Sequence, residues 1–177
     1  MSHANRGKAW EQHLELFHAR YEARGDAVVI RTPPPMRIIR SNAGGTFIAC
    51  YEKEGPPDYV LLTRGKAVMA EAKECSANRW ALKNLHPHQA KRLTDWANQG
   101  GHSIVLLHHK PSSTYWTLPW ARLRPIWDRW YMQSLANRRA ASGSASLGVG
   151  ELASIGIQFG RDGYLETILT IAPKPLP

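Results

Sequence analysis

The sequence has no long apolar segment. Its uncharged apolar runs, such as residues 104–107, are far shorter than the roughly 20 residues that a membrane-spanning helix needs. Charged side chains at Arg6, Lys8 and Glu11 occupy the region where a signal peptide would carry its apolar stretch. We therefore expect a soluble, cytoplasmic protein with no membrane partner.

Cysteine and acidic residues are also scarce. Cys50 and Cys75 are the two cysteines, and nothing indicates export to an oxidising compartment, so we expect both to be free thiols. The chain has 14 Asp and Glu against 23 Lys and Arg, a net charge of +9. This excess favours a polyanionic partner, with nucleic acid first. A length of 177 residues and 43% hydrophobic residues fit one globular domain.

The spacing of apolar residues predicts an α/β domain with a mixed sheet. A helix is expected over residues 5–24, where Trp10, Leu14, Phe17 and Tyr21 recur at helical spacing. Two further helices are expected over residues 86–98 and 120–139. Runs rich in β-branched and aromatic residues, broken by Gly and Pro, predict the strands. These cover residues 28–30, 36–40, 46–51, 58–62, 67–73, 103–107, 114–118 and 155–159.

Two carboxylates are expected to face each other in the hairpin over residues 58–73. Residues two apart on a strand share a face, so Glu71 and Lys73 point the same way. A two-residue turn at Arg64-Gly65 pairs Asp58 directly with Glu71, with Cβ atoms roughly 4.5–5.5 Å apart. Like charges in this position repel each other. A purely structural role as surface strand residues would therefore not explain why two carboxylates are paired.

A hard divalent cation does explain the pair. Mg²⁺ takes carboxylate oxygens, keeps several waters, holds a scissile phosphate and lowers the pKa of the attacking water. Lys73, on the same face, can orient that water or neutralise charge developing on phosphorus. The hairpin therefore predicts a site for phosphodiester hydrolysis.

This pattern resembles the PD-(D/E)xK nuclease superfamily, and further landmarks resemble RecU-type Holliday junction resolvases. The resemblance runs over residues 5–130. It implies a restriction-endonuclease-like fold, a mixed β-sheet flanked by helices with a protruding β-hairpin stalk. It also implies a Mg²⁺- or Mn²⁺-dependent endonuclease that acts as a homodimer and cuts four-way DNA junctions symmetrically. The landmarks are, in order, Asn5-Arg6-Gly7-Lys8 with Glu11, Thr32-Pro33, Pro57-Asp58-Tyr59, Glu71-Ala72-Lys73-Glu74 and residues 82–89.

The resemblance also assigns roles to single residues. It implies metal binding by Asp58, Glu71 and Gln89, and stabilisation of the transition state by Lys73. Glu11 matches a first-helix glutamate that many of these nucleases use, with a solvated helix position as the alternative. The family has a threonine two residues before the metal-binding aspartate; this chain has Pro56 there, so a water or Glu11 would fill that coordination place.

Affinity for DNA is expected from basic residues spread along the chain. Trp80, next to two of them, is a candidate for stacking on an exposed base. A zinc site with Cys75 is the weaker alternative, because structural zinc sites usually use closely spaced cysteine pairs. The expected DNA contacts are Arg6, Lys8, Arg37, Arg40, Arg79, Lys83, His86 and His88.

We expect residues 1–139 to form the nuclease domain, with the stalk at about 33–56. Residues 140–150, rich in Ser, Gly and Ala, are expected to be a flexible linker, and residues 151–177 a C-terminal segment that packs on the domain. Aromatic residues beyond the needs of one small core are expected to supply the dimer interface. These are Trp116, Trp120, Trp127, Trp130 and Tyr131.

Two alternative functions stay open at this stage. One is a restriction-like or repair nuclease that acts on duplex or flapped DNA. The other is a DNA-binding protein without catalysis, which would require the loss of Asp58, Glu71 or Lys73. All three residues are present.

Overall fold

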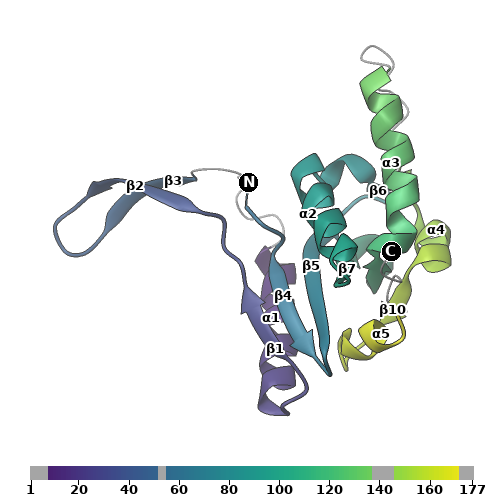
Figure 1. Cartoon of the computed structure of the whole chain (residues 1–177), viewed down its shortest axis with the longest axis horizontal. Helices are drawn as coiled ribbons and strands as arrows, with labels where there is room; N and C mark the ends of the chain where they lie inside the picture. The colour runs from purple at the N-terminus through teal and green to yellow at the C-terminus, as the bar shows by residue number, and fades with distance from the viewer. Residues whose placement is uncertain (1–7, 52–54, 137–145, 172–177) are drawn as a thin grey trace.

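The computed structural model describes residues 8–51, 55–136 and 146–171 (Figure 1). Its centre is a six-stranded sheet in the order β1-β4-β5-β7-β8-β10. The β5–β7 pair is parallel and the other neighbours are antiparallel. The strands are β1 (Val28–Arg31), β4 (Tyr59–Thr63), β5 (Lys66–Cys75), β7 (His102–His109), β8 (Thr114–Pro119) and β10 (Ile157–Phe159).

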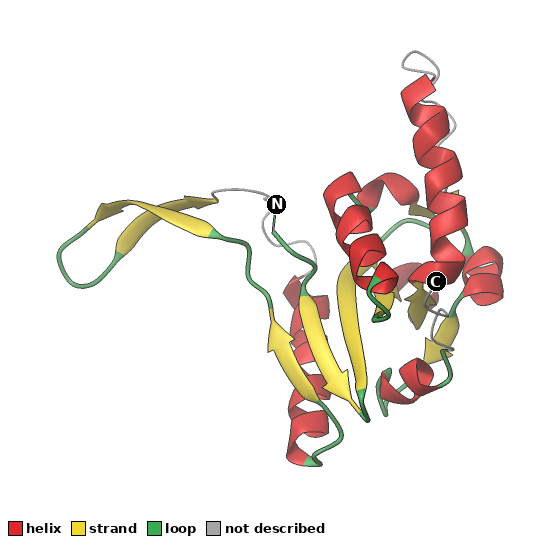
Figure 2. Cartoon of the chain, in the orientation of Figure 1, coloured by secondary structure: helices red, strands yellow, loops and turns green. Residues whose placement is uncertain are grey.

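Helices cover both faces of this sheet, as Figure 2 shows. Short elements complete the chain: the pair β6 (Trp80–Ala81) and β9 (Ser146–Leu147), and the 3-10 helices η2 (Leu82–Asn84) and η3 (Lys110–Ser112). The predicted mixed α/β fold is confirmed. The α-helices are α1 (Lys8–Ala23), α2 (Pro87–Asn98), α3 (Trp120–Ala136), α4 (Val149–Ile155) and α5 (Leu165–Leu169). None of them is long and apolar enough to cross a membrane.

Two apolar cores lie on the two faces of the sheet. The buried stripe of α1, which includes Trp10 and Phe17, packs with Val68 and Ala70 of β5. Because successive strand residues point to opposite faces, Met69 joins the other core, with α2 and α3. The periodicity that predicted a helix over residues 5–24 therefore also marks the buried face of α1, whose described part begins at Lys8.

The β4–β5 hairpin has the predicted register. Arg64 and Gly65 form its turn, and both have positive φ, 45° and 76°. A two-residue turn with positive φ at both positions matches the twist of the flanking strands. Tyr59 pairs with Ala70 and Thr63 with Lys66, so Asp58, one residue before β4, lies opposite Glu71.

A separate hairpin, β2 (Met36–Ser41) and β3 (Phe47–Tyr51), projects from the body of the molecule on the left of Figure 1. We call this hairpin the arm; it confirms the predicted protruding stalk. A β-bulge adds one residue between Ile38 and Arg40. Arg37 therefore pairs with Cys50 and Arg40 with Ile48, two positions on the same face of β3.

The other face of the arm is apolar. Met36 and Ile38 lie there, on the face opposite Arg37, and Phe47 shares it because it is two residues from Ala49, the partner of Ile38. Each of these three side chains is more than half exposed. The bulge therefore separates the arm into a basic face and an apolar face.

Two expectations for the aromatic residues are wrong. Trp80 is completely buried in the core below α2 and α3, so it cannot stack on an exposed base. Trp116, Trp120 and Trp127 are at most 5% exposed in the same core, so they cannot supply a dimer interface. Helices α2 and α3 pack across one face of the sheet, and the large rings of these four tryptophans fill the space between the layers. Trp130 and Tyr131 are half-buried against that core.

The expected linker also differs in part. Residues 140–145 lie outside the described part of the chain, whereas residues 146–150 form β9 and the start of α4. Arg79 binds this segment: its guanidinium donates to the Ser146 carbonyl at 2.6 Å and to Glu151 at 2.7 Å. Further on, the Tyr164 N–H donates to the Tyr21 hydroxyl at 2.7 Å, which holds the C-terminal segment against α1.

Candidate active site

Charged and polar side chains from three elements and from the segment before β4 meet around a cavity of about 330 Å³. Asp58 precedes β4, Glu71 and Lys73 lie on β5, Gln89 on the first turn of α2 and Glu11 on α1. The structure thus brings together the five residues that sequence analysis assigned to catalysis and metal binding.

Glu71 lies at the centre of this group and is 1% exposed. Its Oε1 accepts from the Lys73 ammonium at 2.7 Å and from Gln89 Nε2 at 2.5 Å. Its Oε2 is buried and accepts no hydrogen bond from the described residues. This oxygen of the Glu71 carboxylate is therefore shielded from water and has no hydrogen-bond donor within the described part of the chain.

The two carboxyl groups have raised pKa values. Burial, with a smaller contribution from the Asp58 charge, raises the pKa of Glu71 to about 7, although Lys73 acts in the opposite direction. Burial also raises the pKa of Asp58, against the Ala72 N–H, which donates to Asp58 Oδ2 at 2.8 Å, and against Lys73 and Arg31. Without further positive charge, the site disfavours two ionised carboxylates.

This donor set fits a divalent cation. Mg²⁺ is usually held by one or two carboxylates and keeps several of its waters. Within residues 8–51, 55–136 and 146–171, no three His, Cys, Asp or Glu side chains gather as a metal-binding group. A cation at this cavity would therefore rest on Asp58 and Glu71, with Glu71 Oε2 available to it.

Gln89 is engaged at both ends of its amide. Its Oε1 accepts the backbone N–H of His86 at 3.0 Å, which caps the start of α2, while its Nε2 donates to Glu71. In this arrangement Gln89 orients the Glu71 carboxylate. Direct metal binding by Gln89 stays a prediction.

Glu11 lines the cavity and pairs with Arg31 at 2.5 Å. Arg31, at the end of β1, also lies 3.7 Å from Glu15, and sequence analysis missed it. Thr32, which follows Arg31, gives the Thr32-Pro33 landmark a structural role. Its backbone N–H donates to the Asp58 carbonyl at 2.9 Å, and its hydroxyl donates to the Pro57 carbonyl. These bonds fasten the end of β1 to the segment that carries Asp58.

Glu74 is a second residue that sequence analysis did not place in the site. It lines the same cavity and accepts from Lys110 Nζ at 2.8 Å, and its other oxygen lies 3.5 Å from His108 Nδ1. Its position in Glu71-Ala72-Lys73-Glu74, directly after the catalytic pattern, was the available sequence clue.

The expected DNA contacts fall in several places. Arg37 and Arg40 lie exposed on the arm, Lys8 at the start of α1 and Lys83 on η2. The rings of His86 and His88 stack at 5.7 Å at the start of α2, near Gln89. Arg79 is bound to Ser146 and Glu151, and Arg6 lies outside the described residues.

Comparison with known proteins decides the family. The family model described as Recombination protein U (RecU) matches residues 5–142, more than half of the chain. The chain belongs to the RecU family. The RecU-type resemblance drawn from the sequence landmarks is thereby confirmed.

Curated RecU relatives match over different lengths. Holliday junction resolvase RecU of Bacillus pumilus is 29% identical over 96% of this chain and 83% of its own length. The protein of the same name from Streptococcus gordonii is 30% identical over 66% of this chain and 61% of its own length. Among solved structures, the Holliday junction resolvase Hjc of Archaeoglobus fulgidus is 15% identical, with a TM-score of 0.47 over 86% of this chain and 95% of that one.

We predict that Glu71→Gln stabilises this RecU-family protein when no metal is present. Folding raises the pKa of Glu71 from 4.5 to about 7, so the stability of the folded chain falls as the pH rises from 4.5 to 7, and the full penalty is present above pH 7. The free energy of unfolding of the variant should exceed that of the wild type by roughly 1–3 kcal/mol at pH 8 in EDTA, and the difference should shrink at pH 4.5. Denaturant titrations at the two pH values measure this.

The exposed Glu166→Gln is the matched control and should change little at either pH. Added Mg²⁺ should raise the stability of the wild type more than that of Glu71→Gln, because binding to the folded state stabilises it. A Glu71→Gln protein less stable than the wild type at pH 8 in EDTA contradicts this account of the site.

Proposed function

We propose that this chain is a metal-dependent endonuclease that resolves four-way DNA junctions by paired, symmetric cuts. The observation that carries the proposal is the convergence of Asp58, Glu71 and Lys73 on one cavity, with one half-buried carboxylate, one buried carboxylate and one ammonium. The names of the similar RecU proteins support the four-way junction as the substrate.

Asp58 and Glu71 would hold Mg²⁺ or Mn²⁺, which when bound supplies positive charge to the scissile phosphate and lowers the pKa of the attacking water. The Ala72 N–H fixes one Asp58 oxygen and the Gln89 amide fixes one Glu71 oxygen, so both carboxylates are oriented before substrate arrives. Lys73 reaches the same cavity and stabilises the negative charge that develops on the phosphoryl oxygens. Glu11, held by Arg31, lies at the edge.

The arm is the proposed selector for junctions. A linear duplex has no central opening, whereas a four-way junction has one that a two-stranded arm can enter. The bulge places Arg37 and Arg40 on one face, where both can contact the phosphates of the same strand. Lys8, Lys83, His86 and His88 are proposed to contact the DNA backbone nearer the cavity.

A homodimer is part of the proposal. Resolution needs two cuts, and one chain carries one set of Asp58, Glu71 and Lys73, so two copies must act together. Since Trp116, Trp120 and Trp127 are core residues, other exposed apolar side chains must form the interface. Because DNA is the proposed substrate, we propose that the dimer works in the cytoplasm.

We predict that Asp58→Asn, Glu71→Gln and Lys73→Ala each lower the cleavage rate about 100-fold or more and leave junction binding nearly unchanged. The three groups act on the reacting phosphate, whereas affinity comes from many phosphate contacts. Labelled four-way junctions with Mg²⁺ measure cutting, and gel shifts in EDTA measure binding. Lys91→Ala, which removes an exposed α2 lysine paired with Asp95, is the control and should cut normally. Cutting by Lys73→Ala at the wild-type rate would overturn the mechanism.

We predict that exchanging Arg40 and Ser41, as Arg40→Ser with Ser41→Arg, lowers the preference for junctions over duplex and keeps the net charge. Position 41 pairs with Phe47, so the exchange moves the second arginine to the face of the arm opposite Arg37. The measurement is the ratio of the junction and duplex affinities at one fixed salt concentration. Ile39→Ala keeps both arginines in place and serves as the control. An unchanged ratio would show that the arm is not the selector and would favour a nuclease for duplex or flapped DNA.

We predict that a mixed dimer of wild-type and Asp58→Asn chains nicks one strand of a junction and does not resolve it. Each chain supplies one site, so one active copy leaves the opposite strand intact. Sedimentation confirms the dimer, and denaturing gels of each labelled strand show the cuts. Resolution by a monomer would contradict the homodimer.

A further inference from the structure

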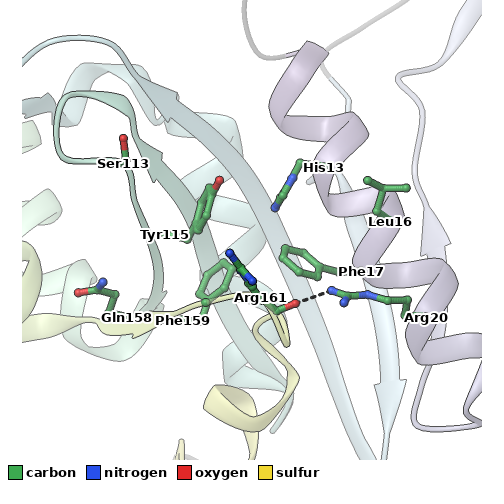
Figure 3. A pocket seen from close by; sticks show the side chains of 10 residues that line it. His13, Leu16, Phe17, Arg20, Ser113, Tyr115, Gln158, Phe159 and Arg161 are labelled. Carbon is green, nitrogen blue, oxygen red and sulfur yellow. Dashed lines mark hydrogen bonds between the residues drawn. The ribbon is translucent and has the colours of Figure 1, made fainter.

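A second cavity, of about 700 Å³, lies between α1 and the strands β8 and β10 (Figure 3). We call it the aromatic pocket, and define it by His13, Leu16, Phe17, Arg20, Tyr115 and Phe159, together with Ser113 and residues 158, 160 and 161. It has about twice the volume of the candidate active-site cavity. None of the roles assigned above uses it.

Aromatic rings make up much of its wall. The rings of His13 and Tyr115 stack with centroids 5.2 Å apart, and those of Tyr115 and Phe159 stack at 5.7 Å. Phe17 meets Phe159 edge to face at 6.1 Å. Phe17 and Phe159 are at most 7% exposed, so the half-buried rings of His13 and Tyr115 are the ones that a flat, unsaturated ligand can contact.

The polar part of the lining is basic. The ten lining residues include Arg20 and Arg161 and no carboxylate. Arg20 is held in place, because it donates to the Arg161 carbonyl at 2.7 Å and lies over the Phe17 ring at 4.9 Å. A ligand that complements this lining has an aromatic ring and a negative charge.

The aromatic pocket is linked to the candidate active site by direct contacts. The Tyr115 ring lies 4.8 Å from the His108 ring. His108 Nδ1 lies 3.5 Å from Glu74, which lines the active-site cavity. The two cavities are therefore joined through the side chains of Tyr115, His108 and Glu74.

We propose that the aromatic pocket binds an unstacked nucleobase together with its phosphate. The base packs on the aromatic wall, and Arg20 and Arg161 attract the phosphate. The volume lies within the range of ligand sites in proteins, about 300–1,000 Å³. This inference rests on the proposed function, because a DNA substrate supplies the nucleotide.

The test is fluorescence titration of the full-length protein in EDTA with 2-aminopurine deoxyriboside 5′-monophosphate, whose emission is quenched by stacking. Gly160→Phe adds a ring to the lining of the pocket, at a position where a Cβ meets no atom within 4 Å and the residue has no positive φ. Gly150→Phe is the matched control: Gly150 is equally open and lies on α4, outside the pocket. Arg161→Ala removes one cation, with the exposed Arg122→Ala on α3 as its control.

We expect saturable quenching by the wild type, Gly150→Phe and Arg122→Ala, and affinity at least about tenfold weaker for Gly160→Phe. Arg161→Ala should lose several-fold in affinity for the monophosphate and little for the nucleoside without phosphate. Thermal unfolding checks that Gly160→Phe is folded. If it is not folded, the comparison of Arg161→Ala with Arg122→Ala decides whether the pocket binds the nucleotide.

Absence of saturable quenching by the wild type would overturn the proposal, and so would equal affinities for a folded Gly160→Phe and the wild type. A Gly160→Phe variant that sediments as a monomer and still binds the nucleotide normally would assign the pocket to the contact between two copies instead. Junction cleavage by the wild type is measured separately. A protein that binds the nucleotide but cuts no junction would support the nucleotide-binding pocket and contradict the proposed function.

Discussion

The repulsion between the half-buried carboxylate of Asp58 and the buried carboxylate of Glu71 is the constraint on which the rest of the site depends. They lie opposite each other because the turn at Arg64 and Gly65 fixes the register of β4 against β5. Burial raises the pKa of both groups. Two features of the site offset the free energy of placing two negative charges there. Lys73 supplies one positive charge, and one Glu71 oxygen is left to bind a second positive charge.

Two elements next to the β4–β5 hairpin, α2 and β1, hold these carboxylates in place. Gln89, in the first turn of α2, ties the helix start to Glu71. Thr32, just after β1, ties that strand to Pro57 and Asp58. A shift of either element would move a carboxylate, so the packing of α2 and β1 on the central sheet is also what sets the geometry of the site.

The arm, unlike the elements of the site, is not held by packing on the central sheet. It lies outside both cores, and an isolated two-stranded hairpin is at best marginally stable in water. Its exposed apolar face and its basic face therefore suit a role in contact with a partner. The bulge between Ile38 and Arg40 matters for this reason, because it decides which side chains share a face.

The sequence by itself determined the features that depend on local chemistry. The spacing of Trp10, Leu14 and Phe17 predicted α1 and its buried face, and the Arg64-Gly65 turn predicted the pairing of Asp58 with Glu71. Tertiary structure decided what depends on contacts between distant segments. Trp80, Trp116, Trp120 and Trp127 are core residues because two helices cover them, which composition cannot reveal. Arg79 binds residues 146 and 151, and the aromatic pocket joins α1 to residues 113–115 and 158–161. Segments so far apart in the chain meet only when the two layers pack on the sheet, so no periodicity or motif in the sequence could predict them.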